Sequence, residues 1–205
     1  MRSITIPGNI QIEKFAFTDN FYEFYNSNNR VGGTYTIQRR QTANWEYIIW
    51  NINNIRHAYI TQYRGNDERV TIPSTIENVK VKGIFSRDGQ SQNSYGVIDW
   101  NRNSRTKICI ISKGIEFIGY NAFSYSNLTT LQIPDSVRRI GIHAFLQLKE
   151  DITTIKIGSN VAIEPPSERQ FIEVSAFNFA EFYNNNEKRK GTYRYTNETW
   201  TYRRR

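Results

Sequence analysis

The chain has 205 residues and a formal net charge of +8. Its one cysteine, Cys109, can form no internal disulfide; because it lies in the apolar run 108–111, we expect it to be a small buried residue. No apolar stretch is long enough to span a membrane, and the first residues lack the apolar core of a signal peptide. An excess of Ile, Phe and Tyr favours strands over helices.

Residues 1–19 are predicted to be the remnant of a repeat. The segment S-I-T-I-P (3–7) matches T-L-Q-I-P (130–134), so the chain begins inside a repeat unit. Because solenoids need capped ends, a chain that begins in mid-repeat is expected to be a fragment of something longer.

Residues 20–47 are predicted to form an aromatic β module that closes this first array. We expect strands over 21–25, 34–37 and 45–47, with a turn over 26–33 in which Gly33 takes a positive φ. The segment NFYEFYNSNNRVGGTY (20–35) returns as NFAEFYNNNEKRKGTY (178–193), and each copy is followed by a Trp-x-Tyr motif. Residues 178–205 are therefore predicted to be a second closing module, with a basic tail.

Residues 48–84 are predicted to start a second array. Residues 59–61 and 70–72 flank the turn 65–67 and suggest a β-hairpin. Residues 85–107 are polar and rich in turn-forming residues, so we expect an inserted loop there.

Residues 108–177 are predicted to be a solenoid, because three segments, 114–135, 136–159 and 160–183, are similar to one another. The period of 20–25 residues is interrupted near residues 165–166. Phe123, Phe145 and Phe177 align in this register and are predicted to stack as one buried column, in which Phe145 is the most sensitive to truncation. Side chains alternate along a strand, so Leu131 and Ile133 should point inward.

The string NLTTLQIPDSVRRIGIHAF (127–145) resembles the BspA-type leucine-rich repeats of bacterial and protist surface proteins. The resemblance implies an α/β-type leucine-rich-repeat solenoid, dominated by strands with little helix, which small antiparallel β modules flank here. It also implies a non-enzymatic, adhesion-type protein that binds other proteins, and a secreted or cell-surface location, although no signal peptide is visible.

Two surfaces are candidate binding sites. The first is the set of outward strand positions of the stacked turns, given by the register as Thr5, Ile108, Ile110, Thr130, Gln132, Thr154 and Lys156. The second is an aromatic patch that could stack on sugars or could instead seal the ends of the array, consisting of Tyr22, Tyr25, Tyr35, Trp45, Tyr183, Tyr193 and Trp200.

The sequence offers no catalytic, metal-binding or cofactor-binding constellation. His57 and His143 are its only histidines, and neither has a nucleophile or ligand set at a fixed spacing. His143 aligns with Asn121, which indicates a variable corner position. The predicted partner is therefore a protein or, alternatively, a surface glycan. Nucleic-acid binding through the basic and aromatic segment 188–205 is a weaker alternative.

Overall fold

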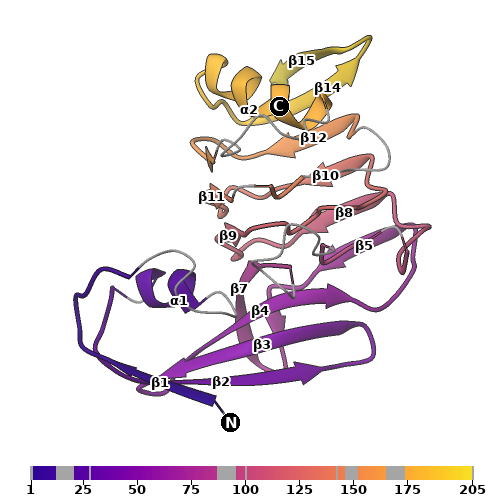
Figure 1. Ribbon diagram of the computed structural model, residues 1–205. Helices are drawn as coiled ribbons and strands as arrows, with labels where there is room; N and C mark the ends of the chain where they lie inside the picture. Colours follow the sequence, from indigo (N-terminus) through magenta and orange to yellow (C-terminus); the bar gives the residue numbers. More distant parts are fainter. Residues whose placement is uncertain are drawn as a thin grey trace.

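The computed structural model describes residues 2–12, 21–27, 29–86, 96–99, 101–141, 143–145, 152–164 and 174–204. It is a strand-rich stack of turns with little helix, and its two ends lie at opposite ends of the stack (Figure 1). The elements in chain order are β1 (Arg2–Ile6), α1 (Phe21–Ser27), β2 (Gly33–Gln41), β3 (Trp45–Ile52), β4 (Ile55–Tyr63), β5 (Arg69–Ile72), β6 (Thr75–Ile76), β7 (Val79–Ile84), β8 (Ile108–Ile111), β9 (Phe117–Ile118), β10 (Thr130–Gln132), β11 (Arg139–Ile140), β12 (Thr154–Ile157), β13 (Ala162–Ile163), α2 (Val174–Asn185), β14 (Gly191–Thr196) and β15 (Thr199–Arg204).

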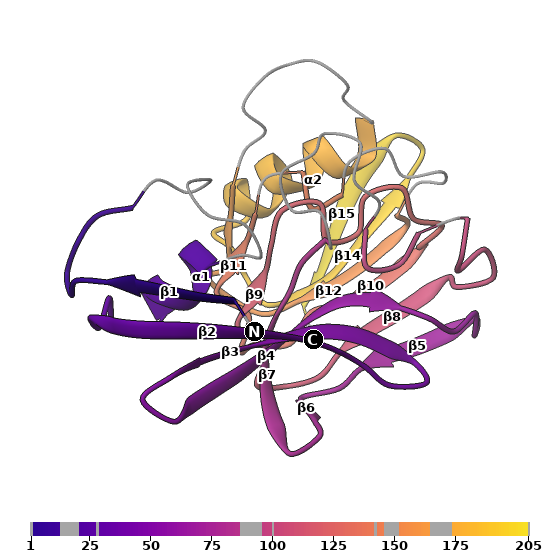
Figure 2. The same cartoon turned by 60° about the horizontal axis from the view of Figure 1, so that its bottom comes forward.

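These strands form two main sheets. A nine-stranded sheet runs β1-β2-β3-β4-β7-β9-β11-β13, with β6 paired to β7, and a six-stranded sheet runs β15-β14-β12-β10-β8-β5. Figure 2 shows β1 and β2 on one side of the molecule and the strands of the six-stranded sheet on the other. Strands β5, β8, β10 and β12 are parallel, as expected for stacked repeats, whereas β14 and β15 are antiparallel.

Alternation along the strands builds the core of the array, as the sequence predicts. Leu131 and Ile133 are buried, and Thr130 and Gln132 point outward. The strand register places one inward residue of each strand opposite the inward residue of its neighbour. None of these residues is more than 5% exposed, and they are Val70, Cys109, Leu131, Ile155 and Tyr193. Each fully buried side chain of this size stabilises the fold by roughly 1.5–3 kcal/mol.

Segment 21–25 is a helix, so the prediction of a strand there is wrong. Phe21, Phe24 and Tyr25 are completely buried, and their i, i+3, i+4 spacing places them on one face of α1. This face packs on the antiparallel hairpin β2–β3 through Tyr35 and Trp50. Gly33, at the start of β2, has a φ of 146°, as expected.

The second closing module has the same geometry as the first. Phe179 of α2 lies 4.9 Å from the Trp200 ring, with an interplanar angle of 57°, and Phe21 lies 5.0 Å from Trp50 at 56°. The Tyr183–Tyr193 pair (5.5 Å, 70°) likewise repeats the pair formed by Tyr25 and Tyr35 (5.8 Å, 68°). Trp50, and not Trp45, is therefore the counterpart of Trp200.

One tyrosine hydroxyl in each helix makes two hydrogen bonds to the segment that directly follows β1 or β12. Tyr183 Oη donates to the Gly158 carbonyl (2.7 Å) and accepts from the Val161 amide (3.2 Å). Tyr25 Oη makes the same two bonds, to the Pro7 carbonyl and from the Ile10 amide, each 3.2 Å long. The repeated unit therefore includes a strand that lies ahead of each helix in the sequence, β1 in one copy and β12 in the other.

The prediction of a hairpin over residues 59–72 is wrong. Strands β4 and β5 do not form a hairpin, because β4 pairs with β3 and β7, and β5 pairs with β8 in the other sheet. Residues 96–99, within the predicted polar loop, are buried, and Tyr63 N donates to Val97 O at 2.8 Å. The Asn103 carboxamide, completely buried, donates to the carbonyls of Tyr63 and Gly65. The interruption at 165–166 lies outside the described residues.

The predicted phenylalanine column exists for two of its three members. The Phe123 and Phe145 rings stack at 6.1 Å with an interplanar angle of 7°. Phe123 is completely buried, whereas Phe145 is only partly buried, so the expected ranking of the two is reversed. The backbone of Phe177 belongs to α2 rather than to a repeat corner, and its side chain lies outside the described part.

Truncation of Phe123 tests this packing. We expect Phe123→Ala to lower the free energy of unfolding by about 3–5 kcal/mol, because it leaves a cavity in a closed part of the core. Phe145→Ala should cost less, since its ring is already partly solvated. Urea unfolding followed by circular dichroism measures both, and a larger loss for Phe145→Ala would contradict the packing described here.

Removal of one hydroxyl tests the attachment of α2. Tyr183→Phe leaves the buried Val161 amide and Gly158 carbonyl without their shared partner, so we expect a loss of about 1–3 kcal/mol. The control is Tyr202→Phe, whose hydroxyl donates to the Lys190 carbonyl at an exposed site and should change stability by at most about 0.5 kcal/mol. Equal effects of the two variants on the thermal midpoint would show that the Tyr183 hydroxyl does not anchor the helix.

Candidate functional site

The outward side chains of the six-stranded sheet form two continuous rows, which we call the outer face. Because β5, β8, β10 and β12 are in register, their outward residues lie opposite one another, and β14 and β15 extend both rows. The first row contains Arg69, Ile108, Thr130, Thr154, Arg194 and Thr201, and the second contains Thr71, Ile110, Gln132, Lys156, Thr192 and Arg203.

The structure brings six of the seven predicted face residues together. Ile108, Ile110, Thr130, Gln132, Thr154 and Lys156 occupy adjacent positions on β8, β10 and β12, and all six are half-exposed. Thr5 does not join them, because β1 belongs to the other sheet and pairs with β2, where the Thr5 and Thr34 hydroxyls share a hydrogen bond of 2.8 Å. The predicted alignment of outward residues on β8, β10 and β12 was therefore correct, whereas the position predicted for Thr5 was wrong.

The outer face carries positive charge on both sides of an apolar pair. Arg69, Lys156, Arg194 and Arg203 belong to its two rows, and none of the twelve positions is acidic. Ile108 and Ile110 lie between these cations, on β8, the second strand from the β5 edge of the sheet. Threonine and glutamine occupy most of the remaining positions and supply hydrogen-bonding groups. Such a surface is complementary to an acidic partner with an apolar contact of its own.

A shallow hollow adjoins the outer face where β8, β10 and β12 end. It has a volume of about 250 Å³, and Ile110, Gln132 and Lys156 of the outer face are among its lining residues. Lys113 adds another cation, and Lys190 forms an ion pair with Asp135 at its border. The hollow therefore extends the positive surface beyond the strands themselves.

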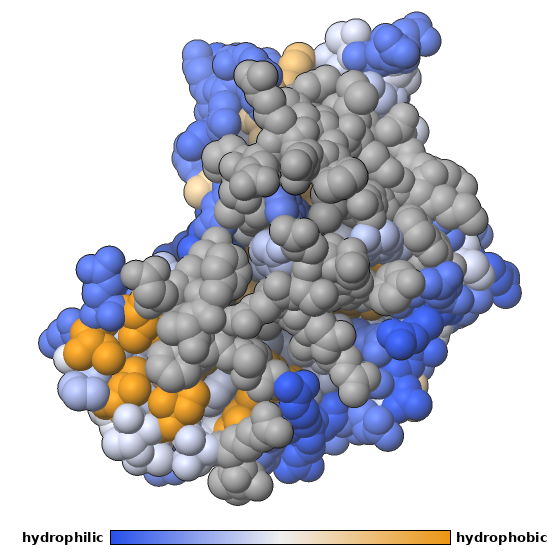
Figure 3. Space-filling model, in the orientation of Figure 1, coloured by the Kyte–Doolittle hydropathy of each residue, from blue (hydrophilic) through white to orange (hydrophobic). Residues whose placement is uncertain are grey.

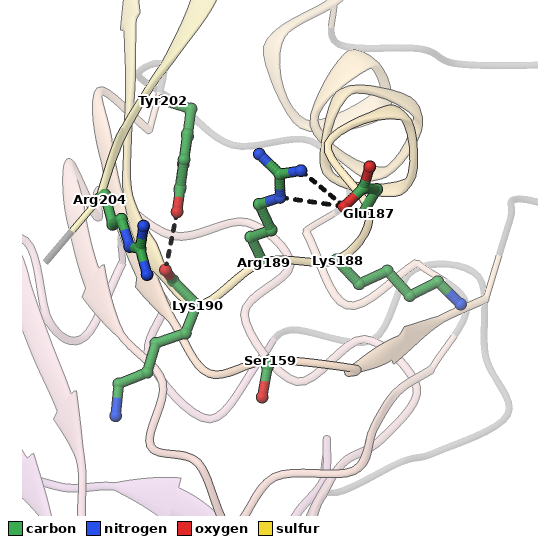
Figure 4. A pocket seen from close by; sticks show the side chains of 7 residues that line it. All are labelled: Ser159, Glu187, Lys188, Arg189, Lys190, Tyr202 and Arg204. Atoms are coloured by element: carbon green, nitrogen blue, oxygen red, sulfur yellow. Dashed lines mark hydrogen bonds and ion pairs between the residues drawn. The ribbon is translucent and has the colours of Figure 1, made fainter.

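A second, larger hollow of about 660 Å³ lies beside the start of β14 (Figure 4). Its lining includes Lys188, Arg189, Lys190 and Arg204, together with one carboxylate, Glu187, which pairs with Arg189 at 2.6 Å. The ring of Tyr202 stands at its wall, held by the bond from its hydroxyl to the Lys190 carbonyl at 3.1 Å. Part of the basic segment noted in the sequence therefore lines this hollow, whereas Arg194 and Arg203 lie on the outer face.

Most of the predicted aromatic patch is core. Tyr25, Tyr35, Tyr183 and Tyr193 have no exposed area, and Trp200 and Trp45 are 3% and 9% exposed. Only Tyr22 is half-exposed. Burial, together with the neighbouring Tyr25, raises the pKa of Tyr35 to about 12, and burial raises that of Tyr193 in the same direction. Rings in this position pack against each other and cannot stack on a ligand, so the proposed exposed patch is corrected to two buried clusters.

The surroundings of Cys109, His143 and His57 favour structural roles for these side chains. Cys109 is completely buried, and burial raises the pKa of its thiol far above the usual range, so a thiolate nucleophile is disfavoured. His143 Nδ1 lies 3.3 Å from the Tyr120 hydroxyl, and burial lowers its pKa. It has a φ of 59°, close to the 53° of Asn121, so the two are equivalent corner positions. Burial and then the charge of Lys82 lower the pKa of His57.

Searches for a metal cluster and for a membrane helix give negative results over the part of the chain that the structure describes. No three His, Cys, Asp or Glu side chains in it come together as possible metal ligands. None of its helices has the length and apolar character needed to cross a membrane.

Six residues of the outer face were missed by the sequence reasoning: Arg69, Thr71, Thr192, Arg194, Thr201 and Arg203. A signal for Thr71 did exist, because V-T-I-P (70–73) has the same pattern as L-Q-I-P (131–134). The four residues of β14 and β15 carry no repeat pattern. Their place on the face follows from antiparallel pairing with β12, which the repeat register does not predict.

Comparison with known proteins identifies the array. The family model for the BspA type leucine rich repeat region, in six copies, matches residues 101–191. No curated protein and no solved structure matches the chain. The matched segment includes β8 to β13, which are the parallel strands that stack as successive turns. Residues 101–191 of this chain are a BspA-type leucine-rich repeat region.

Proposed function

We propose that the chain is a non-enzymatic binding protein and that the outer face binds a protein partner with an acidic surface. The observation that carries this proposal is the pair of continuous rows across six strands, with four cations and no carboxylate among twelve positions. Stacked repeats present extended binding surfaces of this kind. The resemblance to bacterial and protist surface proteins supports adhesion at a cell surface as the setting.

Two isoleucines near the β5 edge of the outer face supply the apolar contact that such an interface needs. Ile108 and Ile110 are half-exposed on β8, with polar side chains of β5 and β10 on either side. In protein interfaces, binding energy is concentrated in a small apolar centre, while the charges around it guide association and register. The arrangement therefore favours a protein partner over a small molecule.

The alternative of glycan binding through aromatic rings loses its support. It required exposed faces on the predicted patch, and six of its seven rings are at most 9% exposed. The rings instead pack inside the two buried clusters described above. We therefore place the binding function on the strands and not on the closing modules.

Charge reversal on the outer face tests the proposal. Partners are first captured from extracellular protein with the immobilised chain, identified by cross-linking, and purified. We expect Lys156→Glu combined with Arg194→Glu to weaken the binding of a genuine partner by about 10-fold or more, because like charges then face each other. Binding by the unmodified chain should weaken as salt rises.

The matched control is Lys80→Glu combined with Arg138→Glu, which changes the net charge equally at exposed positions away from the outer face. This control should bind like the unmodified chain. If both double variants bind equally well, or lose affinity equally, the outer face is not the binding site. Melting temperatures of the two variants establish that each is folded before binding is compared.

A further inference from the structure

The two copies of the repeated module differ at one edge. In the second copy, β12 lies between β10 and β14. In the first copy, β1 pairs with β2, the counterpart of β14, and no other strand of the described chain pairs with β1. Among the described residues, the edge of β1 that corresponds to the β10 side of β12 is therefore open.

The equivalence of β1 and β12 is established residue by residue. Ile4 pairs with Tyr35 as Ile155 pairs with Tyr193, and Ile6 pairs with Gly33 as Ile157 pairs with Gly191. Asn9 and Asn160 have φ values of 58° and 57°, and their amides donate to the carbonyls of Arg30 (2.8 Å) and Lys188 (2.9 Å). The shared tyrosine bonds complete the match.

Apolar residues that are covered in the second copy are partly exposed in the first. Ile155 is 1% exposed and Val161 is completely buried, whereas their counterparts Ile4 and Ile10 are only partly buried. Figure 3 shows the resulting hydrophobic surface at the lower left, over β1 and the segment that follows it.

The preceding turn satisfies backbone groups of β12 along the same edge. The Thr154 amide donates to Thr129 O (3.1 Å), and Lys156 O accepts from the Ile133 amide (2.7 Å). Beyond the strand, the Ala162 amide donates to Arg138 O at 2.9 Å. The corresponding groups of the first copy are the Ser3 amide, the Thr5 carbonyl and the Gln11 amide. An open strand edge of this kind is a template for pairing with another strand.

We propose that the open edge of β1 and the apolar surface beside it bind a BspA-type leucine-rich repeat turn, whose strand runs parallel to β1. Its strand residues would lie opposite Ser3, Ile4 and Thr5, as Thr130, Leu131 and Gln132 lie opposite Thr154, Ile155 and Lys156. The first aromatic module is then a joint between two arrays, with one array on β1 and the other starting at β4.

A whole repeat turn fits this surface better than a second copy of the chain. The apolar surface continues from Ile4 on the strand to Ile10 and Ile12 in the following segment. Edge-to-edge pairing of two β1 strands would cover the strand but leave that segment exposed. In the array, the turn that carries β10 covers both parts of the surface. Leu131 lies opposite Ile155 on the strand, and the Arg138 carbonyl accepts from the Ala162 amide in the segment that follows.

The test adds two repeat turns, which carry β8 and β10, to the 205-residue chain. Residues 101–151 are fused directly ahead of Met1, since Met1 corresponds to Ile152. Hydrogen exchange of the Ser3 and Thr5 amides is compared with that in the unmodified chain. We expect exchange at both amides to slow by about 10-fold or more, because an open edge strand becomes an inner strand.

The matched control carries Leu131→Asp in the added copy only, which places a carboxylate opposite Ile4 and should return exchange to the rate of the unmodified chain. Unchanged exchange in the fusion protein overturns the proposal, as does an added segment that stays unfolded, since the surface is proposed to order it. Sedimentation of the unmodified chain tests the other occupant. A dimer that already protects Ser3 and Thr5 would assign the edge to a second copy.

Discussion

The structure depends on the contact between one turn and the next. A single turn of this array contributes only a short strand on each side, and it cannot bury its own apolar residues. Parallel pairing in register solves this by placing Cys109, Leu131 and Ile155 in one buried line, each opposite the next. The same register that buries the inward residues aligns the outward ones. The outer face is therefore a direct consequence of the packing, because a shift in register would move the inward and the outward residues together.

The constraint is most severe at the ends of the stack, where a turn lacks a neighbour. Here the aromatic modules replace a repeat turn with a helix and an antiparallel hairpin. Tyr193 takes the place of the next inward aliphatic residue, opposite Ile155, and Phe179 and Trp200 close the space behind it. Aromatic rings suit this task because each buries a large area with few rotatable bonds. Their sequestration explains why they cannot serve as the sugar-binding platform that the composition suggested.

The sequence was a good guide wherever the repeat register determined structure, and a poor one elsewhere. It predicted the inward and outward residues of β10, the buried cysteine and the duplicated module. It failed for α1, because aromatic residues favour strands, although the spacing of Phe21, Phe24 and Tyr25 is helical. It equated Trp45 with Trp200 because each begins a Trp-x-Tyr motif. In the structure the equivalent of Trp200 is Trp50, since Trp50 pairs with Ile37 of β2 as Trp200 pairs with Tyr195 of β14. The place of β14 and β15 in this sheet depends on long-range antiparallel pairing, which local patterns do not contain.

The two modules use one design for two different tasks, and the difference lies in the outer strand of each hairpin. Strand β3 is buried along most of its length, because β4 pairs with it and begins the array. Strand β15 carries Thr199, Thr201 and Arg203 at exposed positions, and exposed charge is a common protection of a strand edge. A hairpin with an apolar outer strand can thus receive another strand, while a polar one ends the sheet. The strands that pair with β14 and β2 show the opposite difference. Strand β12 of the second module is paired on both sides, whereas β1 of the first module has an open edge. The module is therefore best understood as a joint with two docking edges, whose side chains determine which edges are occupied.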